Sequence, residues 1–231
     1  MTPSPPETSK RRSSDVIGIA VIFLLLIGIV AIMALRPHAQ PVQEAPPVPT
    51  ATFAPSVPGV TPIEPPRIVA DFTMPAALPG GELGELSLSE LEGKHTLVFF
   101  GYTHCPDFCP ITLAEFIQIK RALGDQAEQL QFLFVSVDGE RDTPESIRAY
   151  LDGFDPTFIG MSGVRDTLEP IRPDYGLYYE LRTNEGRGDN YLVDHSTPSY
   201  LIDPQRRLAA IYSYDASAGI IAADIAERLA S

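Results

Sequence analysis

The sequence predicts an α/β domain with a central mixed sheet, and three observations lead to that prediction. Two almost entirely apolar runs, at residues 96–101 and 131–137, are typical of buried strands in a parallel sheet. A stretch with helical character follows each of them, as in an α/β fold. Strand-like runs nearer the C-terminus are separated by turn residues and predict antiparallel hairpins. Parallel and antiparallel strands with interleaved helices therefore make up the expected domain.

The expected elements occupy residues 71–231, which is the length of one ordinary domain. In chain order they are a strand at 71–77, a helical turn at 87–91, a strand at 96–101, a helix at 110–123, a strand at 131–137, a helix at 143–154, a strand at 157–161, a partly helical stretch at 166–175, hairpin strands at 177–182 and 190–193, hairpin strands at 199–202 and 208–212, and a helix at 216–229. This order, with flanking helices and an inserted hairpin, predicts a thioredoxin-like α/β sandwich.

Local signals define two of the helices. The helix at 110–123 has apolar side chains expected near one buried face, namely Ile111, Phe116, Ile119 and Leu123. Gly124 follows, where glycine commonly ends a helix. Thr143 and Pro144 supply a capping oxygen and a first-turn proline for the next helix. Residues 141–144 are therefore interpreted chiefly as helix capping.

The N-terminal part of the chain predicts a membrane anchor. Residues 16–35 form an unbroken apolar run, as long as the ~20 residues that a helix needs to cross a bilayer core. A cleaved signal peptide is the alternative, although its apolar region usually has only about 7–15 residues. Lys10, Arg11 and Arg12 precede the run, so the positive-inside rule leaves residues 1–15 in the cytoplasm. In a bacterium this predicts a single-pass protein of the inner membrane with its C-terminal domain in the periplasm.

Residues 36–70 are predicted to form a proline-rich linker between anchor and domain. Ten of the chain's 23 prolines lie between Arg36 and Arg67, a composition typical of a semi-extended polyproline II tether without helix or sheet.

The part of the chain beyond the anchor is strongly acidic. The whole chain has a formal net charge of −13, and residues 1–36 hold four basic and two acidic side chains, which leaves −15 for residues 37–231. Such a field disfavours nucleic acid and anionic lipid surfaces as partners. It favours cations or a basic protein, although solubility alone also accounts for it.

Both cysteines lie in one motif between a predicted strand and a predicted helix. Residues 101–110 read GYTHCPDFCP, which places Cys105 and Cys109 four residues apart. The start of a helix lowers the pKa of a nearby thiol, and the thiolate is both a nucleophile and a metal ligand. The two thiols can therefore close a disulfide with each other or bind one soft metal ion.

Three sequence blocks together resemble the Sco (SenC/PrrC) family. They are GYTHCPDFCP at 101–110, VDGERDTP at 137–144 and NYLVDHS at 190–196. The family consists of membrane-tethered, thioredoxin-like copper proteins that assist assembly of the CuA centre of cytochrome c oxidase. The resemblance covers roughly residues 70–230. It implies the same fold, copper as the metal, and the copper-bearing oxidase subunit or another copper protein as the partner.

The resemblance also implies the ligands, which correspond to Cys105, Cys109 and His195 in this chain. Two thiolates and one imidazole form a soft set suited to Cu(I), and able to hold Cu(II) with an added ligand, whereas a structural zinc site would need four ligands. Oxidation is expected to form an intramolecular Cys105–Cys109 disulfide. His104 is interpreted as a neighbour that modulates the thiol, or as a fourth or transient ligand. Asp138 is interpreted as a solvated carboxylate at the end of a strand, or as part of the site.

Two main classes of function follow. The first is a copper metallochaperone, which binds and delivers rather than catalyses. The second is a thiol–disulfide oxidoreductase that uses Cys105 and Cys109 to reduce the cysteines of a copper apo-protein. Thr197-Pro198 keeps the second class open beside the first, because thioredoxins carry a Thr-Pro that faces their cysteines, usually with a cis peptide. The spacing of the cysteines counts against a general reductase, and the short cytoplasmic tail counts against a sensor that signals through the membrane helix.

Overall fold

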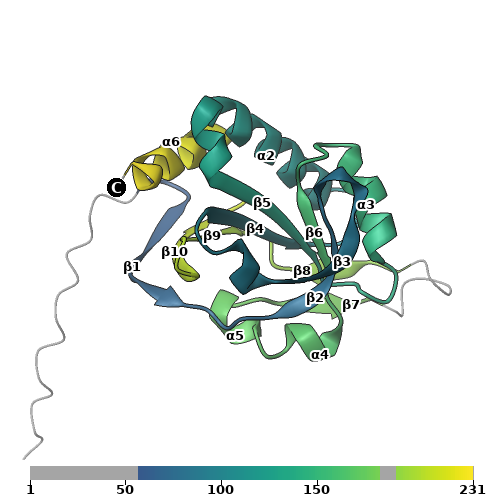
Figure 1. The fold of residues 1–231 in the computed structure, drawn as a ribbon. Helices are drawn as coiled ribbons and strands as arrows, with labels where there is room; N and C mark the ends of the chain where they lie inside the picture. The colour runs from purple at the N-terminus through teal and green to yellow at the C-terminus, as the bar shows by residue number, and fades with distance from the viewer. Residues whose placement is uncertain (1–56, 183–190, 231) are drawn as a thin grey trace, which may run out of the picture. The chain divides into compact units, whose positions relative to one another are not determined.

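Three parallel strands form the centre of the fold (Figure 1). They are β4 (His95–Gly101), β5 (Leu130–Ser136) and β6 (Ile159–Ser162). The structure is a computed structural model that describes residues 57–182 and 191–230. These residues form an eight-stranded sheet in the order β1-β10-β9-β4-β5-β6-β2-β3, and β7 and β8 form a separate pair. The outer strands are antiparallel to their neighbours: β1 (Val60–Ile68), β2 (Thr73–Ala77), β3 (Leu83–Ser87), β9 (Ser199–Ile202) and β10 (Arg207–Tyr212). The predicted mixed sheet is confirmed.

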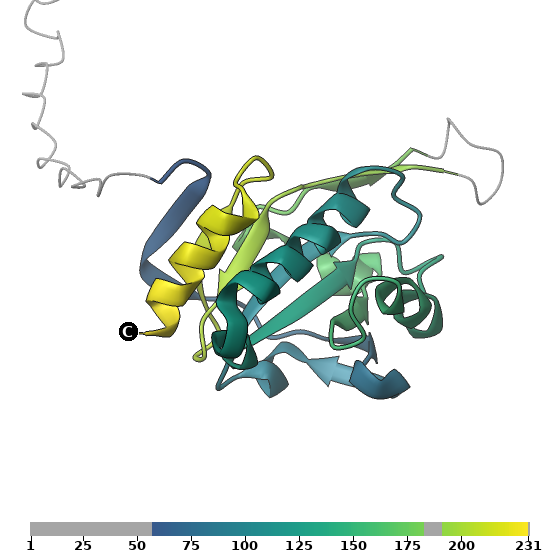
Figure 2. The ribbon, with the colours of Figure 1, turned by 90° about the horizontal axis from the view of Figure 1, so that it is seen from above.

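Helices cover both sides of this sheet. In Figure 1, α2 (Phe108–Leu123) and α6 (Ala218–Leu229) lie above it, whereas α4 (Arg165–Leu168) and α5 (Arg172–Tyr175) lie below it. Figure 2 shows α2 and α6 side by side, consistent with their mutual contacts. Helix α3 (Pro144–Asp152) packs on β6 and β2. Three 3-10 turns complete the described elements: η1 (Pro79–Gly81), η2 (Leu88–Leu91) and η3 (Gly124–Gln129).

Burial of the central strands explains their apolar sequences. Residues 97–100 of β4 are completely inaccessible to solvent, as expected where helices cover both faces of a sheet. The ring of Phe99 meets Phe116 of α2 edge-on, with the ring centres 6.4 Å apart. Burying an apolar side chain of this size contributes about 1.5–3 kcal/mol. The same contact packs the middle of α2 against β4.

Strand β1 corrects the predicted linker. The prediction that residues 36–70 contain no sheet is wrong for the part that β1 occupies, because this strand pairs with β10. Strand β1 is the edge strand of the sheet, where proline is tolerated because one side of the strand needs no N–H donors. Pro62, Pro65 and Pro66 all lie in it, and the pairing register shifts between Pro62 and Arg67. The folded domain therefore includes residues from Val60, well before residue 71.

Three further details differ from the sequence-based expectations. Strand β3 was not expected, since three of its five residues are exposed and it shows no clear alternation. Helix α2 begins two residues before the predicted start, because Pro110 lies in the first turn, where no N–H donor is needed. Ile111 is 42% exposed rather than buried, since it stands five residues, or about 140° of helix rotation, from Phe116.

The helix boundaries follow the predicted signals. The Thr143 hydroxyl accepts the N–H of Ser146 at 3.3 Å and caps α3. Gly124 ends α2 with a φ of 55°, a conformation that favours glycine.

The predicted inserted hairpin is confirmed in its pairing. Strands β7 (Tyr179–Leu181) and β8 (Val193–His195) run antiparallel, with β8 slightly later in the chain than expected. The connecting residues 183–190 lie outside the described residues.

The predicted membrane span at 16–35 also lies outside the described residues, and so does most of the predicted linker. Within residues 57–182 and 191–230, no helix combines the length and the apolar character needed to cross a bilayer. The chain divides into two units, Met1–Thr52 and Phe53–Ser231, and every described residue belongs to the second.

Candidate metal site

The cysteine motif connects the end of β4 to the start of α2. The N–H of Cys105 donates to the Tyr102 carbonyl at 3.2 Å and closes a turn after the strand. Cys109 is the second residue of α2, and N–H groups in the first turn of a helix have no partner within it. Its N–H instead points at the Cys105 Sγ, at 3.5 Å. A Cβ at Gly101 would lie 2.8 Å from the Cys109 Sγ, so the glycine leaves room for this sulfur.

His195 reaches the cysteines from the last position of β8. Its Nδ1 lies 2.9 Å from the Ser196 carbonyl oxygen. Because a carbonyl oxygen only accepts, Nδ1 carries the proton and Nε2 keeps its lone pair in the neutral ring. Nε2 lies 3.4 Å from the Cys109 Sγ. Tyr102 and Phe99 meet the imidazole edge-on, with ring centres 5.7 and 5.9 Å away.

These three side chains bring their donor atoms to one point. The Sγ atoms of Cys105 and Cys109 and a ring nitrogen of His195 lie within 4.8 Å of one another, the one group of this kind in the described part of the chain. Bonds from Cys and His to zinc, as an example, are about 2.0–2.3 Å long, so one ion can join atoms up to ~4.6 Å apart. A small movement of the side chains is therefore enough for all three to bind the same ion.

The pKa values of the two thiols are shifted in opposite directions. The hydrogen bond from Cys109 is the largest influence that lowers the pKa of Cys105, to about 3, and the backbone N–H groups of Asp107 and Cys109 act in the same direction against the effect of burial. Burial, followed by the hydrogen bond with Cys105, raises the pKa of Cys109. The metal-free pair therefore holds a thiolate on Cys105 and a thiol on Cys109.

A cavity of about 470 Å³ gives access to one side of this group. Cys105 and His195 line it, whereas the fully buried Cys109 does not. Thr197 lines it as well. The cis peptide among the described residues is Glu64–Pro65, so the bond between Thr197 and Pro198 is trans, unlike that of thioredoxins. A larger cavity of about 690 Å³ lies near Lys94 and the start of β5, at the other end of the strands.

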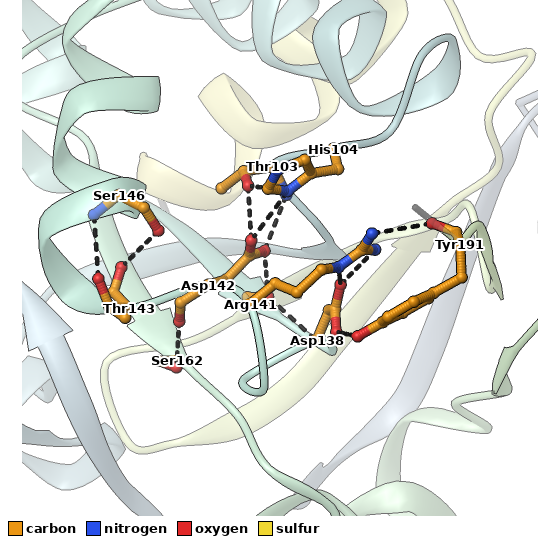
Figure 3. A network of polar contacts seen from close by, with 10 residues as sticks. Thr103, His104, Asp138, Arg141, Asp142, Thr143, Ser146, Ser162 and Tyr191 are labelled. Carbon is orange, nitrogen blue, oxygen red and sulfur yellow. Dashed lines mark hydrogen bonds and ion pairs between the residues drawn. The ribbon is translucent and has the colours of Figure 1, made fainter. Parts of the chain in front are cut away.

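His104 lies outside the group, beside a buried carboxylate. Its Nδ1 is 3.6 Å from Asp142 Oδ1, and its side chain is 57% exposed. Asp142 accepts hydrogen bonds from the Thr103 N–H at 2.8 Å, the Thr103 hydroxyl at 2.5 Å and the Ser136 hydroxyl at 2.6 Å. Figure 3 shows Asp142 beneath Thr103 and His104. The carboxylate thus fixes the backbone two residues before Cys105.

Asp138 is buried, which corrects its interpretation as a solvated carboxylate. Its side chain is inaccessible, and it accepts the Arg141 Nε at 2.6 Å and the Tyr191 hydroxyl at 2.6 Å. Burial raises the pKa of Asp138, whereas the bonds from Tyr191 and Arg141 oppose the rise. Asp138 is not part of the group formed by the cysteines and His195.

Arg141 and Asp142 were predicted to serve helix capping, but Thr143 is the capping residue of α3. Their position gives a signal for a different role, because residues that follow the carboxyl ends of neighbouring parallel strands meet at one edge of the sheet. Both residues follow β5, which lies beside β4 and the loop that carries Cys105.

Comparisons with known proteins identify a family. The family model described as SCO1/SenC matches residues 65–230. The mitochondrial protein SCO2 of Saccharomyces cerevisiae is 36% identical over 133 residues, which are 56% of this chain and 44% of that protein. The mitochondrial SCO1 homolog of Homo sapiens is 34% identical over 139 residues, which are 59% of this chain and 46% of that protein. The chain therefore spans about half the length of these relatives.

A solved structure with a similar fold is that of Bradyrhizobium japonicum ScoI with copper bound. It has a TM-score of 0.60 and 33% sequence identity, and the match covers 70% of this chain and 99% of that one. This likeness confirms the thioredoxin-like α/β fold. Because the family model matches well over half of the sequence, the chain belongs to the SCO1/SenC family.

Proposed function

We propose that this chain is a copper metallochaperone that acts in assembly of the CuA centre of cytochrome c oxidase. The observation that carries the proposal is the convergence of Cys105, Cys109 and His195 on one point, from two separate segments. Two relatives of known structure, from Bradyrhizobium japonicum and from yeast, were solved with copper bound. The receiving partner is the copper-bearing oxidase subunit or another copper protein.

The donor set suits copper as a cargo that must be bound and then released. Two thiolates and an imidazole form a soft site for Cu(I). Copper binding removes the proton from Cys109, because the ligand is the thiolate. Cys105 and His195 face the cavity, so a receiving protein can reach two of the three ligands.

The proposal includes a tether for this domain. Residues 16–35 serve as a single membrane anchor, with residues 1–15 in the cytoplasm. The domain then stands in the periplasm of a bacterium, on a proline-rich linker that ends before β1. The apolar run at 16–35 and the preceding Lys10, Arg11 and Arg12 support this topology.

Copper titration of the full chain, purified reduced and without air, tests the function. The chain is expected to bind one copper ion, and Cys105→Ser is expected to lose most of the affinity. His195→Ala should weaken Cu(II) binding by about tenfold or more and Cu(I) binding less, since Cu(II) has the stronger preference for nitrogen. His95→Ala is the matched control, because His95 stands at the opposite end of β4. A wild-type chain that fails to bind copper, or a Cys105→Ser chain that binds it equally well, would contradict the proposal.

The chemistry of Cys105 favours thiol–disulfide exchange as a second function. Its thiolate lines the cavity, while the thiol of Cys109 is buried behind it, as an attacking and a resolving cysteine are arranged. The Cys105 thiolate would attack a partner's disulfide, which forms a mixed disulfide and releases one thiol of the partner. Cys109 would then attack the Cys105 sulfur and release the partner's second thiol. The partner would leave with two thiols, and this chain with a Cys105–Cys109 disulfide.

His195→Ala also separates the two functions. Imidazole is a copper ligand, whereas thiol exchange depends on the thiolates and their access. If the variant assembles oxidase normally in cells while Cys105→Ser does not, the chain acts as a reductase. If both variants fail, and excess copper restores His195→Ala, it acts as a metallochaperone.

A further inference from the structure

The position of His195 needs an explanation beyond its own strand. Strands β7 and β8 have three residues each and pair only with one another among the described residues. Two-stranded sheets are marginally stable on their own. The hairpin therefore requires other contacts to hold its last residue beside the cysteines.

Arg141, in the loop between β5 and α3, supplies such contacts. Its Nη1 donates to the Tyr191 carbonyl at 2.9 Å, and its guanidinium lies 3.6 Å from the centre of the Tyr191 ring. Its Nε donates to Asp138 at 2.6 Å, and the Tyr191 hydroxyl donates to the other oxygen of Asp138, also at 2.6 Å. Figure 3 shows Arg141, Asp138 and Tyr191 linked in a closed ring, in which Arg141 meets the main-chain carbonyl of Tyr191 and Asp138 meets its hydroxyl. Tyr191 stands two residues before β8 begins.

We propose that Arg141 is a positioning residue, which fixes the segment entering β8 and thereby places His195 over the cysteine pair. The proposal depends on the proposed function in one respect only, namely that His195 binds copper. We name the ring of Arg141, Asp138 and Tyr191 the arginine clamp.

The chemistry of a guanidinium explains why this position needs arginine. The side chain of Arg141 is only 10% exposed and that of Asp138 is inaccessible, so the pair is removed from water. A planar guanidinium can donate in several directions and stack on an aromatic ring at the same time, which a lysine ammonium cannot do. The guanidinium also lies 5.8 Å from the ring centre of Tyr102, and Tyr102 itself contacts His195.

The same loop also holds the other half of the site. Asp142, the next residue, binds the N–H and hydroxyl of Thr103 in the loop that leads to Cys105. Residues 138–142 therefore contact both the cysteine loop and the approach to His195, although they donate no atom to the group of three. Arg141 acts on the histidine half and Asp142 on the cysteine half.

Arg141→Met in the full chain tests the clamp with two measurements. In the metal-free, reduced chain, hydrogen exchange followed by mass spectrometry should be faster at residues 191–196 and unchanged at the start of α2. With Cu(II) alone as the probe, affinity should fall about tenfold to hundredfold, the range found when groups that orient a metal ligand are lost. The electron paramagnetic resonance spectrum should lose the nitrogen coupling of an imidazole. Cu(I) binding should fall less, since both thiolates remain.

Arg148→Met is the matched control for loss of a buried arginine. Arg148 is 7% exposed and bonds to Asp152 and to the Phe158 carbonyl, on α3 and the chain after it. It should lower stability without changing the Cu(II) spectrum or the exchange at residues 191–196.

Substitutions of Tyr191 keep the test decisive if Arg141→Met does not fold. Tyr191→Phe keeps the stacked ring and should change Cu(II) affinity less than about threefold, whereas Tyr191→Ala should reproduce the loss expected for Arg141→Met. Normal exchange and a normal Cu(II) spectrum in Arg141→Met or Tyr191→Ala would overturn the proposal. The exchange measurement contains no copper, so it tests the clamp even if the proposed function fails.

Discussion

Cys105 and Cys109 share one short motif but have different chemical roles. The N–H of Cys109, left free at the start of α2, points at the Cys105 sulfur. Cys109 itself is completely buried under Gly101 and the aromatic core. The hydrogen bond from the Cys109 side chain, together with the N–H groups at the helix start, therefore stabilises charge on the Cys105 sulfur, and burial keeps the proton on Cys109.

Alkylation of the reduced chain should reveal this asymmetry as a function of pH. A pKa of about 3 means that Cys105 is a thiolate above that pH, so its rate with iodoacetamide should rise through about pH 3–4 and then stay flat to pH 8. An ordinary thiol, with a pKa of about 8.5, would gain nearly tenfold per pH unit over the upper part of this range. Mass spectrometry identifies the modified residue, and Cys109 should remain unmodified.

The control for this profile is Cys109→Ala. It removes the hydrogen bond that lowers the pKa of Cys105 most, so the rise in rate should move to higher pH. A wild-type rate that still climbs between pH 5 and 8 would show that Cys105 is protonated in that range.

At the residue scale, the three residues that converge could be named from the sequence, but the contacts that keep them in place could not. Cys105 and Cys109 could be found from their shared motif, whereas His195 was found through the resemblance of three sequence blocks to a known family. Asp138 was misinterpreted because a carboxylate at the end of a strand is usually solvated. Its burial depends on Arg141 and Tyr191, and the second of these lies 53 residues away along the chain. Such a pairing exists only once the fold has formed.

Strand β4 and helix α2 meet at Gly101, and the site depends on how closely they approach. A Cβ at this position would lie 2.8 Å from the Cys109 Sγ and 2.9 Å from atoms of Phe99 and Phe134. Real Cβ atoms essentially never lie this close to other atoms, so the sulfur, the two rings or the helix would have to move.

Gly101→Ala should therefore damage stability and metal binding together. Overpacking of a core typically costs about 1–3 kcal/mol, and displacement of the Cys109 sulfur should also reduce copper affinity. Chemical denaturation and copper titration measure the two effects. Gly84→Ala in β3 is the control, because nothing lies within 4 Å of its Cβ position. Equal behaviour of the two variants would show that α2 adjusts to the extra methyl group without cost.

At the element scale, apolar strands and capped helices could be predicted, whereas the edges of the sheet could not. Strand β4 is mostly apolar because six of its seven residues are buried. Strand β1 has the composition of a linker, and only its pairing with β10 makes it a strand. Strand β3 is mostly exposed and leaves little pattern. Prediction from sequence is weakest where a strand is stabilised by one neighbour rather than by burial.

The whole molecule is proposed to combine a membrane anchor, a tether and a strongly acidic domain. Its fold class could be predicted because strands and helices alternate along the chain in the order that a mixed sheet requires. The placement of the hairpin that carries His195 could not be predicted, since it depends on a few contacts with the loop after β5.

A reporter enzyme that is active only outside the cytoplasm, fused after Ser231, tests the proposed topology. Because Lys10, Arg11 and Arg12 precede the apolar run, the reporter should be active. Replacing these three residues with Glu should reduce the active fraction by disturbing the orientation. A fusion active only in the cytoplasm would place the thiols in a reducing compartment and remove the basis for periplasmic copper delivery.

The prolines of β1 have a consequence for how copies of this protein meet. An exposed edge strand invites another chain to add to the sheet, and this is a common start of aggregation. Proline lacks the N–H that such an addition needs, and Pro62, Pro65 and Pro66 leave three residues of this edge strand without a donor. At the far edge, β3 offers only five residues. The proposed membrane anchor would concentrate copies of this chain in two dimensions, and blunted edges would then let the sheets lie close together without joining.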